Sequence, residues 1–520
     1  MKKMSFLTIL AASVLAFSAC NDDEGTPDSI IKNRDLTITN KVVSTEFVGN
    51  GAQWGGYDVV PTWFDGQTTL SEADWQKLFH RIDYMRPPFI RVCVSSGWAY
   101  EQNDNPADYK DEKVTSLYKM LDYAQEKNIE IVYGEWGHEY VGDDIASIDM
   151  DWMQRSVIFL NHLVNDKGYS CIKSVNIVNE PNGNWSSTNG NYEVWKAVQE
   201  AYLVEMAKPE YNLADMKLSG PDIAAFNDAT LKDWITDAAA DLNDDIVMYD
   251  IHVYPSQSNV RNGGFTDMLL GYKAEVPEGK RIFLGEIGFK YDATKEDGAV
   301  VDDVLNNENI DAIAADPYAG DDSNMMIYKA FYGIDMADAI IQSMRAGFSG
   351  ALIWGMDDAM YNSPDGDNPD WNTKKLKRWG FWNILGEELC GTPEDEEIRP
   401  YFYTSSLLCR YFPAGSTIYD IELPNKKGVR AIMGEKDGKY TVAIVNSHYV
   451  TYPINLKSDF LSSLTMDKYT YKSNADGTFV GVVDENGFAA PAEKAMSVDF
   501  KSGVQMTLEG ESFILYTNME

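Results

Sequence analysis

A chain of 520 residues is too long for one ordinary hydrophobic core, and its formal net charge of −37 repels phosphate backbones and anionic membrane faces. Apolar residues make up 44% of the chain and aromatic residues 12%, which indicates a folded protein and not a disordered one. We therefore expect one large domain with one smaller domain, and no binding to nucleic acid.

The N-terminus has the features of an export signal. A basic start precedes an apolar stretch over residues 6–17, which is too short to span a bilayer. The small residues before Cys20 resemble the lipobox of bacterial lipoproteins, which implies that residues 1–19 are a signal peptide and that Cys20 is lipidated. An ordinary secretory signal with a chance cysteine is the alternative. The acidic run over residues 21–24 resembles the surface-export signal of Bacteroidetes lipoproteins, so we expect anchoring to the outer membrane, facing the cell exterior.

Residues 20–45 are polar and predict an acidic tether, and from residue 46 to 412 short apolar runs alternate with helical patterns. Eight strand-like runs are found at 53–57, 89–94, 129–133, 175–178, 216–218, 246–253, 281–284 and 350–354. Apolar side chains on both faces of each run are typical of a buried parallel sheet. Eight strand–helix units predict a (β/α)8 TIM barrel over residues 46–412. A doubly wound open sheet is the alternative, although no glycine-rich phosphate loop follows the first strand.

The pattern changes after residue 413. Short strand-like runs at 440–445, 466–471 and 513–516 stand between Gly, Asn and Asp turns, which predicts a smaller C-terminal all-β sandwich over residues 413–520. All 13 tryptophans precede this region. Because exposed tryptophans are the usual platforms for sugars, we expect the smaller domain to be structural.

The sequence indicates no cofactor and no metal centre. Four cysteines remain after the signal, and none has CxxC or zinc-site spacing: Cys93, Cys171, Cys390 and Cys409. Cys390 and Cys409 can pair in an oxidising compartment, and the sequence leaves this open. The acidic run over residues 365–370 either holds calcium, without EF-hand spacing, or forms a solvated loop.

Barrel enzymes carry their functional side chains at the carboxyl ends of the strands. In this chain those positions hold carboxylates among aromatic rings. The candidates for substrate contact are Trp54, Arg91, Glu135, Trp136, His138, Asn179, His252, Tyr254 and Trp354. Indole rings stack on the C–H faces of sugars, while carboxylates and amides bind the hydroxyl groups. The pattern therefore predicts a sugar-binding site.

Two of the carboxylates are suited to break a glycosidic bond. Glu180 and Glu286 follow the fourth and seventh predicted strands, which lie across the barrel mouth from each other. Hydrolysis with retained configuration needs one carboxyl group to protonate the leaving oxygen and another, about 5–5.5 Å away, to attack the anomeric carbon. Glu135 is a rival for a catalytic role, but its place after the third strand favours sugar binding.

The same residues resemble the motifs of glycoside hydrolase clan A. The segment Asn-Ile-Val-Asn-Glu-Pro at 176–181 resembles the strand-four motif of the clan, which implies that Glu180 is the acid/base and that Asn179 binds the sugar 2-hydroxyl. The segment Ile-Phe-Leu-Gly-Glu-Ile-Gly at 282–288 resembles the strand-seven motif, which implies that Glu286 is the nucleophile.

Three further positions fit this resemblance. The segment His-Val-Tyr-Pro at 252–255 is similar to the strand-six pattern, which implies that Tyr254 hydrogen-bonds the nucleophile and that His252 belongs to the same wall. Arg91 matches the strand-two arginine that orients the nucleophile. Trp354 matches the strand-eight tryptophan beneath the sugar at the cleavage point.

These features predict a retaining glycoside hydrolase that cuts β-linked sugars of an extracellular glycan. A barrel that binds glycans without cutting them is one alternative, and a lyase or metal-dependent hydrolase is another. Enzymes for several sugars share the motifs, so action within a chain and action at its end both stay open. Residues 134–140 match no motif of the clan, and we expect them to carry substrate choice, with His138 either in a subsite or structural.

Overall fold

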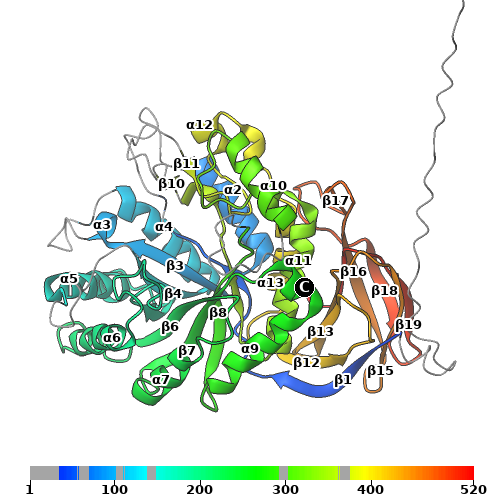
Figure 1. The fold of residues 1–520 in the computed structure, drawn as a ribbon, viewed down its shortest axis with the longest axis horizontal. Helices are drawn as coiled ribbons and strands as arrows, with labels where there is room; N and C mark the ends of the chain where they lie inside the picture. The colour runs from blue at the N-terminus through cyan, green and yellow to red at the C-terminus, as the bar shows by residue number, and fades with distance from the viewer. Residues whose placement is uncertain are drawn as a thin grey trace, which may run out of the picture.

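The computed structural model describes two domains that lie side by side, an α/β barrel and a β domain (Figure 1). The described residues are 34–55, 57, 70–100, 109, 112–136, 148–291, 303–360, 362–363 and 375–520.

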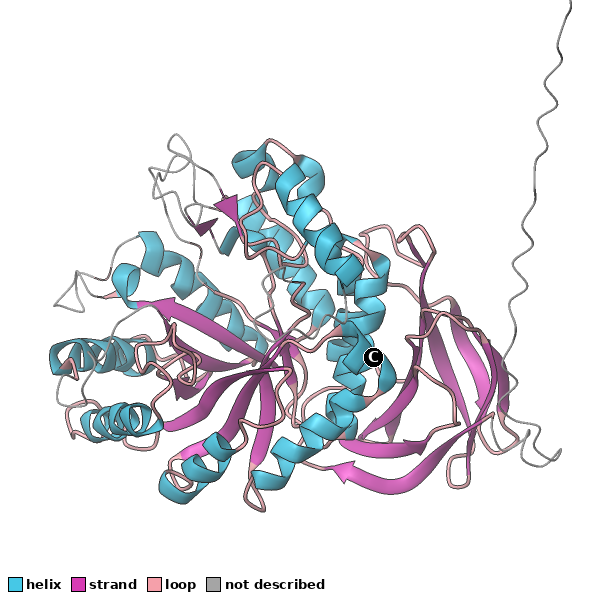
Figure 2. Cartoon of the chain, in the orientation of Figure 1, coloured by secondary structure: helices cyan, strands magenta, loops and turns pink. Residues whose placement is uncertain are grey.

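Eight parallel strands form the barrel (Figure 2). In the order in which they pair they are β2 (Gly51–Ala52), β9 (Ala351–Ile353), β8 (Arg281–Ile287), β7 (Ile246–Val253), β6 (Lys217–Phe226), β5 (Ile172–Asn176), β4 (Glu130–Trp136) and β3 (Phe89–Ser95). A parallel bridge between Gln53 and Arg91 joins the first strand to the last and closes the ring. The predicted TIM barrel is confirmed, and the open sheet is not formed.

Helices cover the outside of the barrel. The main ones are α2 (Glu72–Met85), α4 (Glu112–Lys127), α5 (Met150–Asn161), α6 (Tyr192–Met206), α7 (Asp233–Asp241), α9 (Gly264–Glu275), α11 (Ala330–Arg345) and α13 (Tyr401–Arg410). Another helix of similar length is α10 (Asp303–Ala315), and shorter ones are α3 (Ser96–Ala99), α8 (Gln257–Asn262) and α12 (Gly386–Cys390). Helix α2 begins where its sequence predicts, because the Ser71 hydroxyl accepts from the backbone N–H of Asp74 and the Asp74 carboxylate accepts from that of Ser71.

The β domain is one ten-stranded, mostly antiparallel sheet that curves around its own core. Its strands are β1 (Asp35–Ser44), β12 (Thr417–Glu422), β13 (Val429–Lys436), β14 (Lys439–Asn446), β15 (Tyr452–Ser458), β16 (Ser463–Ser473), β17 (Phe479–Gly481), β18 (Glu493–Asp499), β19 (Val504–Leu508) and β20 (Ser512–Thr517). The predicted C-terminal all-β domain is confirmed.

The predicted tether is wrong for its last residues. Strand β1 pairs with β12 on one side and β15 on the other, so the N-terminal segment lies inside the sheet of the C-terminal domain. Leu36 and Ile38 are fully buried and alternate with more exposed neighbours. This period of two is the signature of a strand with one face on a core, and it outweighs the polar composition of the segment.

Helix α11 joins the two domains. All but two of its residues are buried, because it packs against α13 on the barrel side and against β13, β14 and β16 on the other. The Tyr471 hydroxyl of β16 donates to the carbonyl of Ala330 (2.7 Å). Arg261 of α8 binds Asp335 of α11 and Glu511 of the β domain. The β domain therefore supports the barrel through a buried helix and polar contacts.

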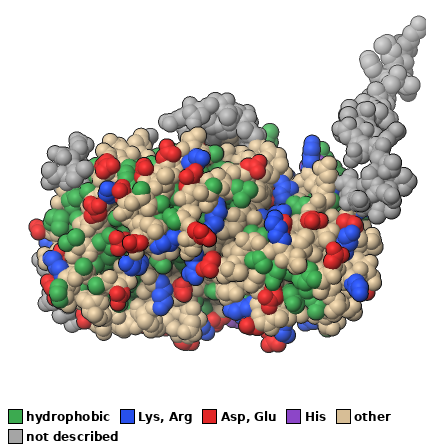
Figure 3. Space-filling view, turned by 90° about the horizontal axis from the view of Figure 1, so that it is seen from below, with side chains coloured by type: hydrophobic (Ala, Val, Ile, Leu, Met, Phe, Trp, Pro, Cys, Tyr) green, Lys and Arg blue, Asp and Glu red, His purple; other side chains and the backbone are tan. Residues whose placement is uncertain are grey.

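The four cysteines in the described residues are buried and free: Cys93, Cys171, Cys390 and Cys409. The disulfide between Cys390 and Cys409, which the sequence left open, is therefore not formed. Among the described residues, no helix is both long enough and apolar enough to cross a bilayer. Acidic and basic side chains are intermixed over the face of the molecule in Figure 3.

Candidate active site

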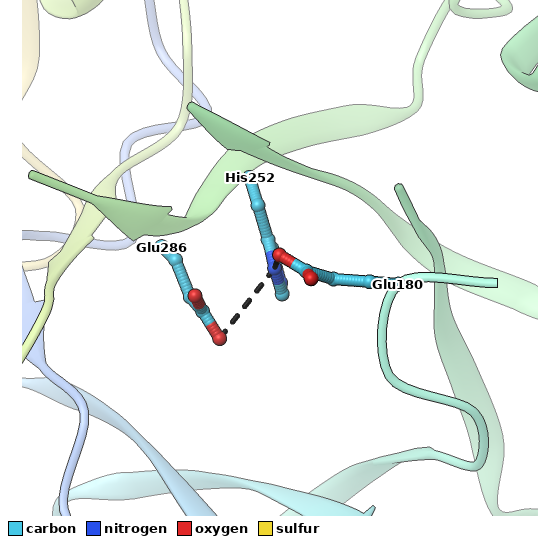
Figure 4. A group of neighbouring side chains, drawn as sticks. All are labelled: Glu180, His252 and Glu286. Atoms are coloured by element: carbon cyan, nitrogen blue, oxygen red, sulfur yellow. Dashed lines mark hydrogen bonds and ion pairs between the residues drawn. The ribbon is translucent and has the colours of Figure 1, made fainter. Parts of the chain in front are cut away.

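Glu180 and Glu286 meet at the mouth of the barrel, at the carboxyl ends of β5 and β8 (Figure 4). One oxygen of each carboxylate and one ring nitrogen of His252 all lie within 4.8 Å of one another. The Glu286 side chain is 4% exposed and that of Glu180 13% exposed. The spacing matches the short separation that retention of configuration requires, about 5–5.5 Å between carboxyl groups.

Glu180 stands on a strained turn. Its φ of 49° places it in the left-handed region, which costs a residue with a side chain about 1–3 kcal/mol. The backbone N–H of Glu180 donates to the carbonyl of Asp222 (3.1 Å), and the Asn182 side chain both accepts from and donates to the backbone of Ala224. These bonds fasten the turn after β5 to β6 and aim the Glu180 carboxylate across the mouth.

Glu286 is held at both of its oxygens. Arg91 Nη1 donates to one oxygen (2.8 Å), and the Tyr254 hydroxyl donates to the other (2.7 Å). Arg91 is fully buried, and its second terminal nitrogen donates to Asn179 Oδ1 (2.8 Å) and Asp222 Oδ2 (2.9 Å). One guanidinium group therefore fixes Glu286 and Asn179 relative to each other.

His252 lies among three carboxylates. Its Nε2 is 2.7 Å from Asp222 Oδ1, and its Nδ1 is 3.0 Å from Glu180 and 3.5 Å from Glu286. Burial lowers the pKa of His252, but Asp222 and Glu286 outweigh it and hold the pKa well above its ordinary value. The protonated form of the ring can donate from both nitrogens to these carboxylates.

The pKa values of two buried aspartates near this ring are shifted in opposite directions. Burial raises the pKa of Asp222, but Arg91 and His252 outweigh it and bring the pKa to about 2. Burial and the neighbouring Asp222 carboxylate raise the pKa of Asp250 well above its ordinary value. Asp222 and Glu286 both lie within reach of Arg91 and of the His252 ring.

Burial also raises the pKa of Glu286, and the neighbouring Glu180 adds to this effect. The charges of His252 and Arg91 and the hydrogen bond from Tyr254 act in the opposite direction. These donors keep the ionised form of Glu286 accessible in a site that otherwise disfavours charge.

The carboxylates lie in a cavity of about 350 Å³. Its lining is Trp136, Asn179, Glu180, Trp185, Phe226, Tyr254, Glu286, Lys290, Asp322, Trp354, Lys377 and Trp379. Trp136 and Trp354 pack together with ring centroids 5.6 Å apart. Aromatic walls around a few fixed polar groups suit the apolar faces and hydroxyl groups of a sugar.

Two predicted contact residues lie elsewhere. Trp54 is fully buried and donates from its indole N–H to the Tyr57 hydroxyl, and Glu135 is buried and accepts hydrogen bonds from hydroxyl groups that include that of Tyr133. The reason is that side chains alternate between the inward and outward faces of a strand. Gln53 and Gly134 face the barrel interior beside Arg91, so the residue after each of them points outward into the helix layer. His138 and the acidic run 365–370 lie outside the described residues.

The sequence analysis missed several residues of the site. Lys290, Asp322, Lys377 and Trp379 come from the long segments after β8 and β9, whose course depends on tertiary packing. Asp250 does carry a local signal, because it is a buried acidic residue in the mostly apolar strand β7, two residues before His252. Its carboxylate lies against Gly285, where an added Cβ would be 2.1 Å from Asp250 Oδ1.

Within the described part of the chain, two groups of side chains have metal-ligand chemistry: Glu180, His252 and Glu286 form one, and Asp222, Asp250 and His252 form the other. His252 belongs to both. Both of its ring nitrogens lie within hydrogen-bond reach of carboxylates. The arrangement is therefore suited to a hydrogen-bonded charge network.

No protein-family model matches the sequence, and no curated protein matches it in a sequence search. Solved structures match it over nearly the whole chain. A family 51 α-L-arabinofuranosidase from Bifidobacterium longum has a TM-score of 0.61 at 11% identity, covering 95% of this chain and 100% of that one. A family 30 endoxylanase from Clostridium papyrosolvens has a TM-score of 0.55 at 14% identity, covering 93% and 99%.

A family 39 β-xylosidase from Caulobacter crescentus has a TM-score of 0.54 at 10% identity, covering 93% of this chain and 99% of that one. At these identities the likeness is one of fold. The chain shares with these glycosidases the fold of a TIM barrel with an attached β domain, and the predicted resemblance is confirmed at the level of fold.

Proposed function

We propose that this protein hydrolyses β-glycosidic bonds with retention of configuration, with Glu286 as nucleophile and Glu180 as acid/base. One observation carries the proposal: two carboxylates from opposite sides of the barrel mouth converge within 4.8 Å on the floor of an aromatic cavity. The fold shared with glycosidases supports it.

In the first step, a Glu286 oxygen attacks the anomeric carbon while protonated Glu180 gives its proton to the leaving glycosidic oxygen. The C–O bond to the leaving group breaks, and a glycosyl ester forms on Glu286. In the second step, water attacks the anomeric carbon, Glu180 takes its proton, and the ester bond breaks. Both carboxyl groups return to their starting states.

The supporting residues prepare these steps. Arg91 and Tyr254 fix the orientation of Glu286 before substrate arrives, which lowers the cost of reaching the attacking geometry. Asn179 accepts from Arg91 through its oxygen, which leaves its amide N–H groups for a sugar hydroxyl. Trp354 and Trp136 supply the apolar wall for the sugar ring.

We further propose that the substrate is an extracellular polysaccharide, cut within the chain by a protein anchored through Cys20 to the outer membrane. The lipobox-like N-terminus and the acidic run after it support this location. A second cavity of about 480 Å³ shares Lys290, Asp322 and Trp379 with the first. Two adjoining cavities offer room for several sugar units, which supports cleavage inside a chain.

A hydrolysis screen tests the function. Soluble protein comprising residues 25–520 is incubated with β-linked glycans and aryl β-glycosides, with Glu286→Ala as control, and the anomer formed first is identified by proton NMR. We expect wild-type protein alone to release oligosaccharides as the β-anomer. Release of the α-anomer would contradict retention, and glycan binding without turnover would identify a binding protein.

A further inference from the structure

The rim of the cavity carries an exposed tryptophan. Of the tryptophans whose burial the structure describes, only Trp185 is largely exposed, with 58% of its surface open to solvent. It follows Glu180 by five residues and lines the cavity of the two glutamates. Keeping so much apolar ring surface in water forgoes the stabilisation that burial would give. An indole that is both exposed and held in one orientation at this place would be a surface prepared for a ligand.

The Trp185 ring is held by three contacts. Its N–H donates to Glu180 Oε2 (2.9 Å), and Phe226 packs edge-on against it with ring centroids 5.8 Å apart. A Cβ added to Gly183 would lie 2.3 to 2.6 Å from three fused-ring atoms of the indole, so the Gly183 backbone lies against one face of the ring. Because that face is covered, the exposure of Trp185 belongs mainly to the opposite face.

Trp185 lies on the side of the acid/base. In the proposed reaction Glu180 protonates the leaving oxygen, so the leaving group lies next to Glu180 and to the indole bonded to it. Trp379 belongs to the other side, because it packs edge-on against Tyr254 with ring centroids 5.7 Å apart, and Tyr254 donates to Glu286. The second cavity adjoins the first at Trp379. Trp185 is thus placed to contact the part of the substrate that departs first.

We propose that the open face of Trp185 binds the sugar unit on the leaving-group side of the bond that is cut. The ligand is a pyranose ring whose apolar C–H face stacks on the indole. The inference rests on the proposed glycosidase function and assigns its leaving group as a sugar. Since the same indole is bonded to Glu180, a sugar stacked on it has its glycosidic oxygen positioned beside the acid.

The second step of the reaction separates sugar binding by Trp185 from the chemistry of Glu180. The glycosyl ester on Glu286 is attacked either by water or by a hydroxyl group of a sugar bound on Trp185. In both cases a C–O bond forms at the anomeric carbon, the ester bond breaks, and Glu180 takes the proton. A weaker base slows both outcomes, whereas loss of the binding face slows only transfer to the sugar. The ratio of transfer to hydrolysis therefore measures the binding face.

The test uses mature protein with β-xylosyl, β-glucosyl and β-galactosyl fluoride, whose fluoride leaves with the proton of Glu180. The acceptors are the matching methyl β-pyranosides and methanol, which attacks as a sugar hydroxyl does but has no ring to stack. Transfer and hydrolysis products are separated by chromatography for the wild type, Trp185→Ala and Trp185→Phe. Tyr449→Ala is the matched control, because that aromatic ring is 79% exposed and follows β14 in the β domain.

At equal acceptor concentration, we expect the wild type to favour a methyl pyranoside over methanol by about tenfold. Trp185→Ala should lower the ratio of sugar transfer to hydrolysis by about tenfold, and Trp185→Phe, which keeps a smaller ring, by about threefold at most. Transfer to methanol should keep its ratio in both variants, and Tyr449→Ala should match the wild type. An unchanged sugar ratio in Trp185→Ala, or an equal loss with methanol, overturns the proposal.

The two proposals fail in different ways. Hydrolysis of a fluoride without sugar transfer that depends on Trp185 leaves the glycosidase function standing and removes the binding face. Where no fluoride is turned over, the affinity for β-linked xylo-, gluco- and galacto-oligosaccharides is measured by calorimetry. An affinity that falls about tenfold in Trp185→Ala then supports the binding face and counts against hydrolysis. Equal affinity in the two proteins, or no binding by the wild type, overturns the binding face.

Discussion

The two glutamates of the site are held in contrasting ways. Glu286 is on a strand, is 4% exposed, and receives hydrogen bonds from Arg91 and Tyr254, which are both fixed in the barrel. Glu180 is on a strained turn, is 13% exposed, and receives one of its hydrogen bonds from Trp185, whose surface is 58% exposed. Glu286 is therefore held rigidly by buried donors (the locked side), whereas Glu180 is closer to solvent (the open side).

This contrast fits two different tasks. A nucleophile acts best when it is ionised and already aimed at the reacting carbon, which requires rigid donors and little water. An acid/base must lose and regain a proton in each cycle, so it needs a path to water. If the assignment is right, changes on the Glu286 side should cost more than comparable changes on the Glu180 side.

The largest effect is expected from Glu286→Ala. Without the nucleophile no glycosyl ester forms, so kcat/KM should fall by about 10⁴-fold or more for every substrate, whatever its leaving group. Initial rates on aryl β-glycosides and on the natural glycan measure this. A variant that keeps activity on activated aryl glycosides would place the nucleophile elsewhere.

Glu180→Ala should depend on the leaving group. For glycans, which need protonation, the loss is expected to be about 10²–10⁴-fold, whereas dinitrophenyl glycosides, which need little protonation, should lose much less. Azide enters the space left by the carboxylate and should restore turnover, giving a β-glycosyl azide. Equal and unrescued losses in both glutamate variants would contradict the two roles.

The two catalytic candidates could be predicted from the sequence. Glu180 and Glu286 were predicted because each follows an apolar strand and sits in a short local motif, so their convergence follows from closure of the barrel. Trp54 and Glu135 were chosen because they lie near the ends of predicted strands, but each follows a residue that faces the barrel interior, so its own side chain points outward.

Residues whose positions depend on long-range packing could not be predicted from the sequence. Lys377 and Trp379 come from the segment after β9, and no local pattern places them beside β8. Strand β1 was missed for the same reason, because its partners β12 and β15 lie more than 370 residues further along the chain. The alternation of Leu36 and Ile38 with polar neighbours is present in the sequence, but the polar composition of the whole segment favoured the prediction of a tether.

Tyr254→Phe tests how Glu286 is held on the locked side, and the pH dependence of kcat/KM is the measurement. Removing the hydroxyl deletes a hydrogen bond that lowers the pKa of Glu286, so that pKa should rise. Glu286 acts ionised, so the acid limb of the kcat/KM profile should move to higher pH, with a loss at the optimum of about 10–100-fold. An unchanged acid limb would show that Tyr254 does not act through Glu286.

The smallest effect is expected from Trp185→Phe, the corresponding deletion on the open side. The indole N–H donates to Glu180 Oε2 (2.9 Å) from a largely exposed ring, and water can replace a donor at that position. We expect kcat/KM to fall by only about three- to tenfold, in line with a net hydrogen bond of about 1 kcal/mol. The phenyl ring keeps part of the contact with Phe226, so lost hydrogen bonding is separated from lost stacking. A loss as large as that of Tyr254→Phe would mean that Glu180 depends on a fixed donor as much as Glu286 does, and the division between a locked nucleophile and an open acid would fail.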